Sequence, residues 1–181
     1  MAQYNGYVSI PHQSYEDWRS ATLGNGYNAD REWGNQCWDY CAELWYQYGL
    51  TLYTKSGGGG AADCWNVSRD KNAKPPFIAV EGKQNIKRGD IVVFGRTRIS
   101  TNGHIGFADE DYNGSNYIKL LSQAPASQGL NGKVFRTDWS LASFIGIFRN
   151  QQWEENPPSP HSVKKKDGFP FVIAKHYWWN R

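Results

Sequence analysis

The amino-acid sequence predicts an α+β fold, with helices in the first half and a small antiparallel β-sheet in the second. Three observations support this prediction: an amphipathic helical pattern at residues 36–48, short β-branched runs from residue 89 onward, and turn signals between those runs. Short strands that follow one another across tight turns are typical of antiparallel meanders, whereas parallel strands need a long crossover between them.

The clearest helix is expected at residues 36–48. Its apolar residues recur at helical spacing, which places them on one face. They are Cys37, Cys41, Leu44, Trp45 and Tyr48. Asn35 is the expected N-cap and Gly49 the expected end of the helix. Cys37 therefore falls in the first helical turn.

Four short β segments are expected in the second half of the chain. They cover residues 90–94, 103–108, 116–123 and 144–149. A turn at Asn113-Gly114 separates the second segment from the third. Shorter helices are expected upstream, near residues 14–20 and 63–66.

One domain is expected over residues 1–152, because 181 residues provide one ordinary core and a short appendage. Residues 153–168 are rich in Pro and Lys and are expected to form a stiff, polar linker. Residues 169–181 are too few for a domain. We interpret them as a tail that docks onto another protein, or as the start of a further module.

The composition is typical of a globular protein and excludes several classes. Hydrophobic residues make up 39% of the chain and charged residues 20%. The formal charge of +3 is too small, and most basic residues are too scattered, to predict a nucleic-acid partner. A mildly basic protein is still attracted to an anionic polymer such as a cell wall. No apolar run is long enough to insert into a membrane.

The cysteines and the first residues indicate where the protein is made. Three cysteines, an odd number, favour free thiols in a reducing cytoplasm over a disulfide framework. The first residues lack a basic segment followed by an apolar run, so no secretory signal is predicted. An extracellular substrate would then require a separate delivery device.

Aromatic residues are unusually frequent, with nine Trp and eleven Tyr. Rings that carry one polar atom serve equally well in a core and at a binding surface. Two interpretations therefore stay open: the rings fill a core that is poor in Met, or some of them line a groove that binds sugars.

Cys37 and His104 are the candidate catalytic pair. A thiol in the first turn of a helix lies near unpaired backbone N–H groups and the positive end of the helix dipole, which favour thiolate. Nucleophilic catalysis also needs a base. His104 opens a predicted strand of small and apolar residues, which is a suitable position, although a structural histidine is the commoner outcome.

Two metal sites are conceivable from the residues alone. Alternating oxygen side chains in a loop, closed by a carboxylate on a helix, are typical of calcium sites. The candidate ligands are Asn28, Asp30, Glu32 and Asp39. An ordinary polar loop that caps the helix is the alternative. A zinc site built from the three cysteines and His104 matches no familiar spacing, so Cys41 and Cys64 are expected to be structural.

Four segments together resemble the CHAP family, the cysteine- and histidine-dependent amidohydrolases and peptidases. Residues 34–40 (Gly-Asn-Gln-Cys-Trp-Asp-Tyr) resemble its nucleophile motif, and residues 103–106 (Gly-His-Ile-Gly) its histidine motif. Residues 87–94 and 144–149 are similar to the strand between these motifs and to a closing strand of phage members. The order and spacing of the segments agree over roughly residues 15–150.

The resemblance implies a papain-like fold, with helices packed on a small antiparallel half-barrel. It implies cleavage of an amide bond in peptidoglycan, as an N-acetylmuramoyl-L-alanine amidase or a stem or cross-bridge endopeptidase. Cys37 would attack and His104 would transfer the proton. A phage endolysin or a tail-associated lysin fits best, made in the host cytoplasm and delivered by a holin or on the virion. Virion proteins are then possible partners of the tail.

The third member of the site departs from the family pattern. Where the family has an acidic residue or Asn to orient the imidazole, this chain has Ser122 and Gln123. Gln123 is the expected orienting residue, and Ser122 the fallback. In the loop, Asn28 and Arg31 replace the usual Asp and Gly. No cofactor is expected to be required, and a structural calcium ion is a weaker expectation.

Two alternatives to a hydrolase stay open. A non-catalytic member of the same fold would use an aromatic groove to hold wall glycan or to join a virion assembly. The imperfect third residue favours this alternative, and the intact Cys37 and His104 pair opposes it. An acyltransferase would use the same chemistry with a different acceptor.

Overall fold

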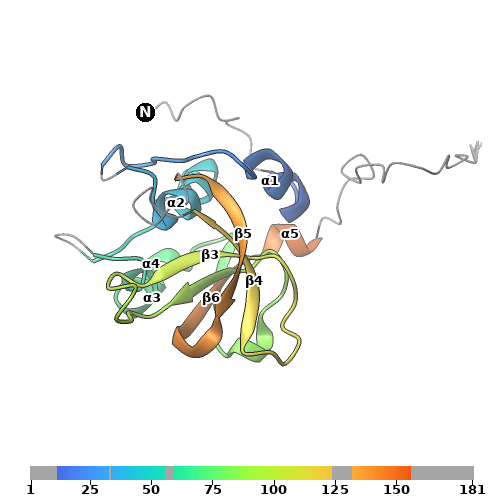
Figure 1. The fold of residues 1–181 in the computed structure, drawn as a ribbon. Helices are drawn as coiled ribbons and strands as arrows, with labels where there is room; N and C mark the ends of the chain where they lie inside the picture. The colour runs from blue at the N-terminus through green and yellow to red at the C-terminus, as the bar shows by residue number, and fades with distance from the viewer. Residues whose placement is uncertain (1–11, 33, 56–58, 124–131, 156–181) are drawn as a thin grey trace, which may run out of the picture.

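A computed structural model describes residues 12–155, except residue 33 and residues 56–58 and 124–131 (Figure 1). The helices are α1 (Tyr15–Thr22), α2 (Cys37–Gln47), α3 (Asp63–Asn66), α4 (Arg69–Asn72) and α5 (Gln151–Glu155). The strands are β1 (Phe77–Val80), β2 (Ile91–Phe94), β3 (His104–Ala108), β4 (Tyr117–Gln123), β5 (Val134–Ser140) and β6 (Phe144–Asn150). The predicted tail and most of the predicted linker lie outside the described residues.

The strands form one antiparallel sheet in the order β1-β6-β2-β3-β4-β5. Strands β2 to β5 follow one another as a meander, and β6 returns to lie between β1 and β2. Helices α1 to α4 precede most of the sheet in the chain. The α+β prediction is confirmed.

All four predicted strands are present, but two further strands were not predicted. Strand β1 comes directly after Pro75 and Pro76, a pair that is typical of a break between elements. Strand β5 alternates charged residues with Phe135, Thr137 and Trp139. This two-residue period is typical of a strand with one face exposed to solvent.

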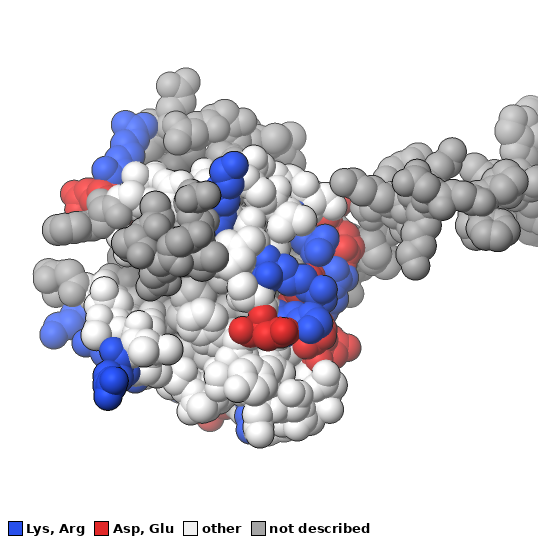
Figure 2. All heavy atoms as spheres, viewed as in Figure 1, with Lys and Arg blue, Asp and Glu red and all other residues white. Residues whose placement is uncertain are grey.

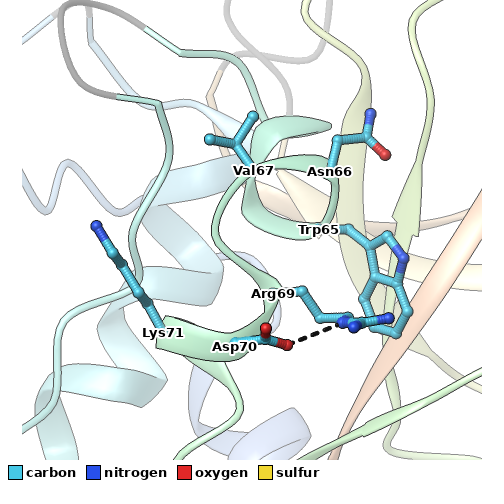
Figure 3. A pocket seen from close by; sticks show the side chains of 6 residues that line it. All are labelled: Trp65, Asn66, Val67, Arg69, Asp70 and Lys71. Carbon is cyan, nitrogen blue, oxygen red and sulfur yellow. Dashed lines mark hydrogen bonds and ion pairs between the residues drawn. The ribbon is translucent and has the colours of Figure 1, made fainter.

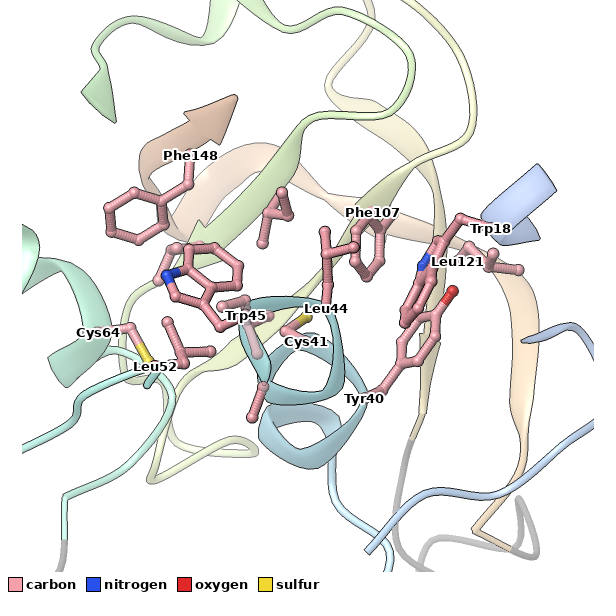
Figure 4. Close-up of a cluster of buried hydrophobic side chains, with 14 of the residues drawn as sticks. Trp18, Tyr40, Cys41, Leu44, Trp45, Leu52, Cys64, Phe107, Leu121 and Phe148 are labelled. Atoms are coloured by element: carbon pink, nitrogen blue, oxygen red, sulfur yellow. The ribbon is translucent and has the colours of Figure 1, made fainter. Parts of the chain in front are cut away.

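The main core lies between the helices and one face of the sheet. Helix α2 packs against β3 and β4. Figure 4 shows its buried side chains, Tyr40, Cys41, Leu44 and Trp45, beside Phe107, Leu121 and Phe148 of the strands. The Trp45 ring stacks on Phe77 with centroids 3.9 Å apart. Trp18 is also fully buried, so several of the aromatic residues fill the core.

The opposite face of the sheet carries a smaller apolar cluster. It includes Val92, Phe94, Ala108, Ile118 and Leu120. Because successive strand residues point to opposite faces, His104 and Ser122 lie on this second face with Ala108 and Leu120. Trp139 packs against the same cluster.

The start of α2 differs from the prediction in one residue. Gln36, not Asn35, is the N-cap, and the helix begins at Cys37. The Asn35 amide donates instead to the carbonyl of Gly132 at 2.8 Å. At the other end Gly49 follows the helix with a φ of 69°, as expected of a residue that ends a helix.

A buried carboxylate after β3 joins α1 to the sheet. Asp109 accepts from the Tyr15 hydroxyl at 3.0 Å and pairs with the guanidinium groups of Arg19, Arg88 and Arg136 at 2.9, 3.2 and 2.7 Å. Arg88 also pairs with Glu16. Figure 2 shows basic and acidic side chains gathered on the side of the molecule where α5 and β4 lie in Figure 1.

None of the helices in the described part of the chain combines the length and apolar character that crossing a membrane requires.

Candidate active site

Cys37 is the first residue of α2 and is partly exposed. Burial raises the pKa of its thiol to about 11, and hydrogen bonds from the backbone at Ile105 and Trp38 oppose that rise. The contact with Ile105 matters for geometry, because Ile105 directly follows His104 in β3. The packing of α2 on β3 therefore brings the thiol to the end of the strand where the histidine lies.

His104 is the first residue of β3, and 6% of its surface is exposed. It follows Gly103, whose φ of 74° and close approach to the Phe94 carbonyl leave no space for a Cβ. Burial lowers the pKa of the imidazole to about 3. At neutral pH the resting pair is thus a neutral thiol and a neutral imidazole.

Cys37 and His104 line the same pocket, which has a volume of about 410 Å³. Gln36, Gly103 and Trp139 are also in its wall. A hollow of about 230 Å³ adjoins it on the cysteine side, and a groove of about 780 Å³ adjoins it on the histidine side. The two residues therefore lie midway along an extended depression.

Ser122, rather than Gln123, is the hydrogen-bond partner of the imidazole. The His104 Nε2 atom lies 3.0 Å from the Ser122 hydroxyl, which approaches closely because Gly106 has no side chain between them. Gln123 points to the opposite face of the sheet. Its amide accepts from the Tyr27 N–H and donates to the carbonyls of Tyr27 and Gln36, all within 2.8 Å. It therefore fixes Gln36, the residue before Cys37.

Trp139 is the site residue that the sequence analysis missed. Its indole stacks on the His104 imidazole, with centroids 3.9 Å apart and planes 17° apart. It comes from β5, the strand that was not predicted. The alternation of Phe135, Thr137 and Trp139 with charged residues is the sequence signal that indicates it.

The predicted calcium ligands surround the start of α2, but Asp39 already has protein partners. Its carboxylate accepts from the N–H groups of Ala29 and Gln36 at 2.8 Å, and it therefore caps the helix. Asp30 accepts from the Glu32 N–H. The Asn28 side-chain oxygen is buried with no hydrogen-bond partner, as a cation ligand would be.

These oxygen donors are of the type that calcium prefers, yet they do not form a recognisable cluster. Among the described residues, no group of three Asp, Glu, His or Cys side chains is arranged to hold a metal ion. Calcium therefore stays a prediction. Cys41 and Cys64 are buried in the core, as expected of structural residues.

A second hollow, of about 550 Å³, lies over α3 and α4, on different elements from the catalytic pair (Figure 3). Its guanidinium group, Arg69, is paired with Asp70 and Glu81 at 3.1 Å and lies 5.8 Å from the centre of the Trp65 ring. The side chains that line it include neither a cysteine nor a histidine, so it offers no nucleophile and base.

The fold and the pocket together define an α+β protein in which a helix that begins with a cysteine meets a strand that begins with a histidine. The chain matches the CHAP domain family over residues 23–124, more than half of its length. It belongs to that family. The motifs that contain Cys37 and His104, and the strand between them, fall within the matched segment, whereas residues 144–149 lie beyond it.

Individual proteins show the same likeness. The D-alanyl-L-alanine endopeptidase of Streptococcus phage B30 is 31% identical over 123 residues, which are 66% of this chain and 26% of the relative. This chain thus spans about a quarter of that relative's length.

Two solved structures share the fold. The endolysin LysIME-EF1 superposes with a TM-score of 0.62 at 20% identity, over 77% of this chain and 65% of that one. Ly7917 superposes with a TM-score of 0.51 at 15% identity, over 76% and 62%. At these identities the likeness concerns the fold, and the predicted arrangement of helices on a small antiparallel sheet is confirmed.

Proposed function

We propose that this chain is a peptidoglycan hydrolase that cleaves an amide bond with Cys37 as nucleophile and His104 as base. The observation that carries the proposal is the shared pocket: a cysteine at a helix start and a histidine at a strand start line one open cavity of about 410 Å³. Membership of the CHAP family and the name of the phage endopeptidase relative support the same substrate class.

The resting pair is uncharged, so the proton moves as the bond forms. Ser122 occupies the Nε2 atom of His104, which leaves Nδ1 to take the proton from the Cys37 thiol. Sulfur attacks the carbonyl carbon, and His104 then protonates the departing amine. The Cys37 and Trp38 N–H groups, which point toward the thiol in the first turn of α2, can stabilise the oxyanion. Water, deprotonated by His104, hydrolyses the thioester.

The bond that is cut is proposed to be a peptide bond of the stem or cross-bridge. The phage relative is named for cleavage between D-alanine and L-alanine, and the depression extends to both sides of the pair, as an extended peptide requires. Cleavage of the muramoyl–L-alanine amide is the alternative, and mass analysis of the products separates the two.

The test compares the wild-type chain with a Cys37→Ala variant on peptidoglycan from several bacteria, with and without calcium. We expect the wild type to clear the suspension and to release new amino groups but no new reducing sugars. The variant should release nothing while keeping its melting temperature. A control variant, Cys41→Ala, removes a different thiol of the same helix that lies in the core, and it should retain activity in its folded fraction.

The opposite result has a defined meaning. If neither protein releases fragments from any wall but both bind it, the catalytic proposal is wrong and the chain is a binding module on a hydrolase fold. Release of a product in which the acyl group has moved to an amine would identify an acyltransferase. We also propose that the protein reaches the wall through a separate membrane pore or on a virion.

A further inference from the structure

The environment of His104 poses a problem for the proposed chemistry. The imidazole must carry a positive charge once it has taken the thiol proton, yet it is almost completely buried. Burial alone accounts for its low pKa. The hydrogen-bond partner, Ser122, is neutral and stabilises a cation less than a carboxylate does.

The charged groups in the groove on the histidine side are paired with other residues, whereas Asp30 and Glu32 line the hollow on the cysteine side, whose wall does not include His104. Two charged side chains besides the histidine line the adjoining groove, Arg96 and Asp138. Arg96 pairs with Asp63 at 2.6 Å, and Asp138 pairs with Lys119 at 2.9 Å. On the other sides, β2 contributes the Phe94 ring and α2 contributes the Cys37 thiol and the backbone-bound Asp39.

Trp139 is the remaining group in close contact with the imidazole. A centroid distance of 3.9 Å and an angle of 17° between the planes place the face of the indole against the face of the imidazole. The face of an indole carries the negative part of its quadrupole and attracts cations more strongly than other aromatic side chains. The contact therefore becomes more favourable when the imidazole is protonated.

We propose that Trp139 is a positioning residue that fixes the plane of the His104 imidazole and stabilises its protonated form, in place of a carboxylate. This role rests on the proposed cysteine–histidine chemistry. Trp139 also lines both the central pocket and the 780 Å³ groove, so its effect on proton transfer must be separated from an effect on substrate binding.

The primary test measures the rate at which a neutral reagent, chloroacetamide, alkylates Cys37 between pH 5 and pH 9. This rate follows the fraction of thiolate, which depends on transfer of the proton to His104, and no peptidoglycan is involved. Cys41→Ala and Cys64→Ala replacements in every variant, or mass mapping of the product, assign the reaction to Cys37.

We expect Trp139→Leu to slow alkylation at pH 7 by about tenfold, and Trp139→Phe to stay within about threefold of the wild type. Tyr117→Leu is the matched control, because Tyr117 is an exposed aromatic residue of the same groove. It should leave the rate unchanged. With wall fragments as substrate, Trp139→Leu should lower kcat, whereas Tyr117→Leu should only raise KM.

His104→Ala, with and without Trp139→Leu, tests the proposal even if Trp139→Leu alters the packing. In a His104→Ala background, replacing Trp139 should have no further effect on alkylation, because the group that it acts through is gone. An unchanged rate in folded Trp139→Leu, or an equal loss in Tyr117→Leu, overturns the proposal. If alkylation responds as expected but the wild type cleaves no wall, the positioning role stands and the proposed substrate is wrong.

Discussion

The two ends of strand β3 hold buried polar residues in opposite ways. At its start, His104 has a hydroxyl and an aromatic ring as neighbours and is held neutral by burial. Just past its end, Asp109 is surrounded by three guanidinium groups and a tyrosine hydroxyl. Burial raises the pKa of Asp109, but hydrogen bonds and charge from Arg19 outweigh it and hold the pKa below its usual value.

The difference suits Asp109 to stabilising the fold and His104 to the proposed proton transfer. A carboxylate that is fully paired keeps its charge over a wide pH range and ties α1 to the sheet. An imidazole that burial holds neutral, with no charged partner, carries a positive charge only when a neighbouring group such as a thiol supplies the proton. Strand β3 thus holds a paired carboxylate at one end and an uncharged imidazole at the other.

Among single substitutions at neutral pH, the largest effect is expected at Asp109, the charged end of β3. Asp109→Asn leaves three guanidinium groups around a neutral side chain and should lower the free energy of unfolding by about 3 kcal/mol. Denaturant titration measures the loss. Asp138→Asn, which removes an exposed partner of Lys119, is the control and should cost less than about 1 kcal/mol. Equal losses in the two variants would contradict a special role for Asp109.

The free energy of unfolding, measured as a function of pH, tests whether His104 is buried in its neutral form. Because the pKa of His104 is about 3 in the folded state and about 6.5 unfolded, the unfolded chain takes up the proton first as the pH falls. The folded state therefore loses stability between pH 6.5 and pH 3, at up to about 1.4 kcal/mol per pH unit. We expect His104→Gln to be less stable than the wild type at pH 8, and this gap to narrow toward pH 4. A gap that is constant with pH would show that the imidazole is solvated.

A smaller effect is expected from the hydroxyl partner. Ser122→Ala removes the hydrogen bond to Nε2 and should lower kcat/KM by about tenfold, with a change in unfolding free energy of about 1 kcal/mol. Gln123→Leu is the adjacent comparison, since it removes three hydrogen bonds to the backbone. It should destabilise more than Ser122→Ala. A larger loss of activity from Gln123→Leu in fully folded protein would return the orienting role to Gln123.

The smallest effect is expected from calcium. If Asn28 and Asp30 bind the ion beside a helix that Asp39 already caps, calcium should add less than about 1 kcal/mol of stability, seen as a small rise in melting temperature over EDTA. Asp30→Asn should abolish the rise, and Asp111→Asn, which changes an exposed acidic residue in the turn after β3, should keep it. A rise that persists in Asp30→Asn would exclude this loop as the site.

The parts of the fold that the sequence predicts are those set by local pattern. The periodicity of α2, the glycine that ends it, the β-branched run of β2 and the small and apolar residues of β3 are local signals, and the structure has these elements at the expected places. The short strand β1 was not predicted, because a pair of prolines directly precedes it. Strand β5 was not predicted because charged residues interrupt its apolar residues, although its two-residue period indicates a strand.

The candidate site was predictable only in part, for a reason of geometry. Cys37 and His104 carry motifs, whereas the choice between Ser122 and Gln123 depends on which face of β4 turns toward the histidine. A shift of one residue in register reverses that choice, and no local pattern fixes it. The stacking of Trp139 on His104 likewise depends on the pairing of β5 with β4, which brings distant segments together.

The adjacent positions of Ser122 and Gln123 have a mechanical consequence. The Ser122 hydroxyl contacts His104, and the Gln123 amide donates to the Gln36 carbonyl, directly before Cys37. Both contacts therefore come from one dipeptide, whose Cα atoms are a fixed distance apart. A displacement of β4 would therefore act on both residues of the proposed catalytic pair at once.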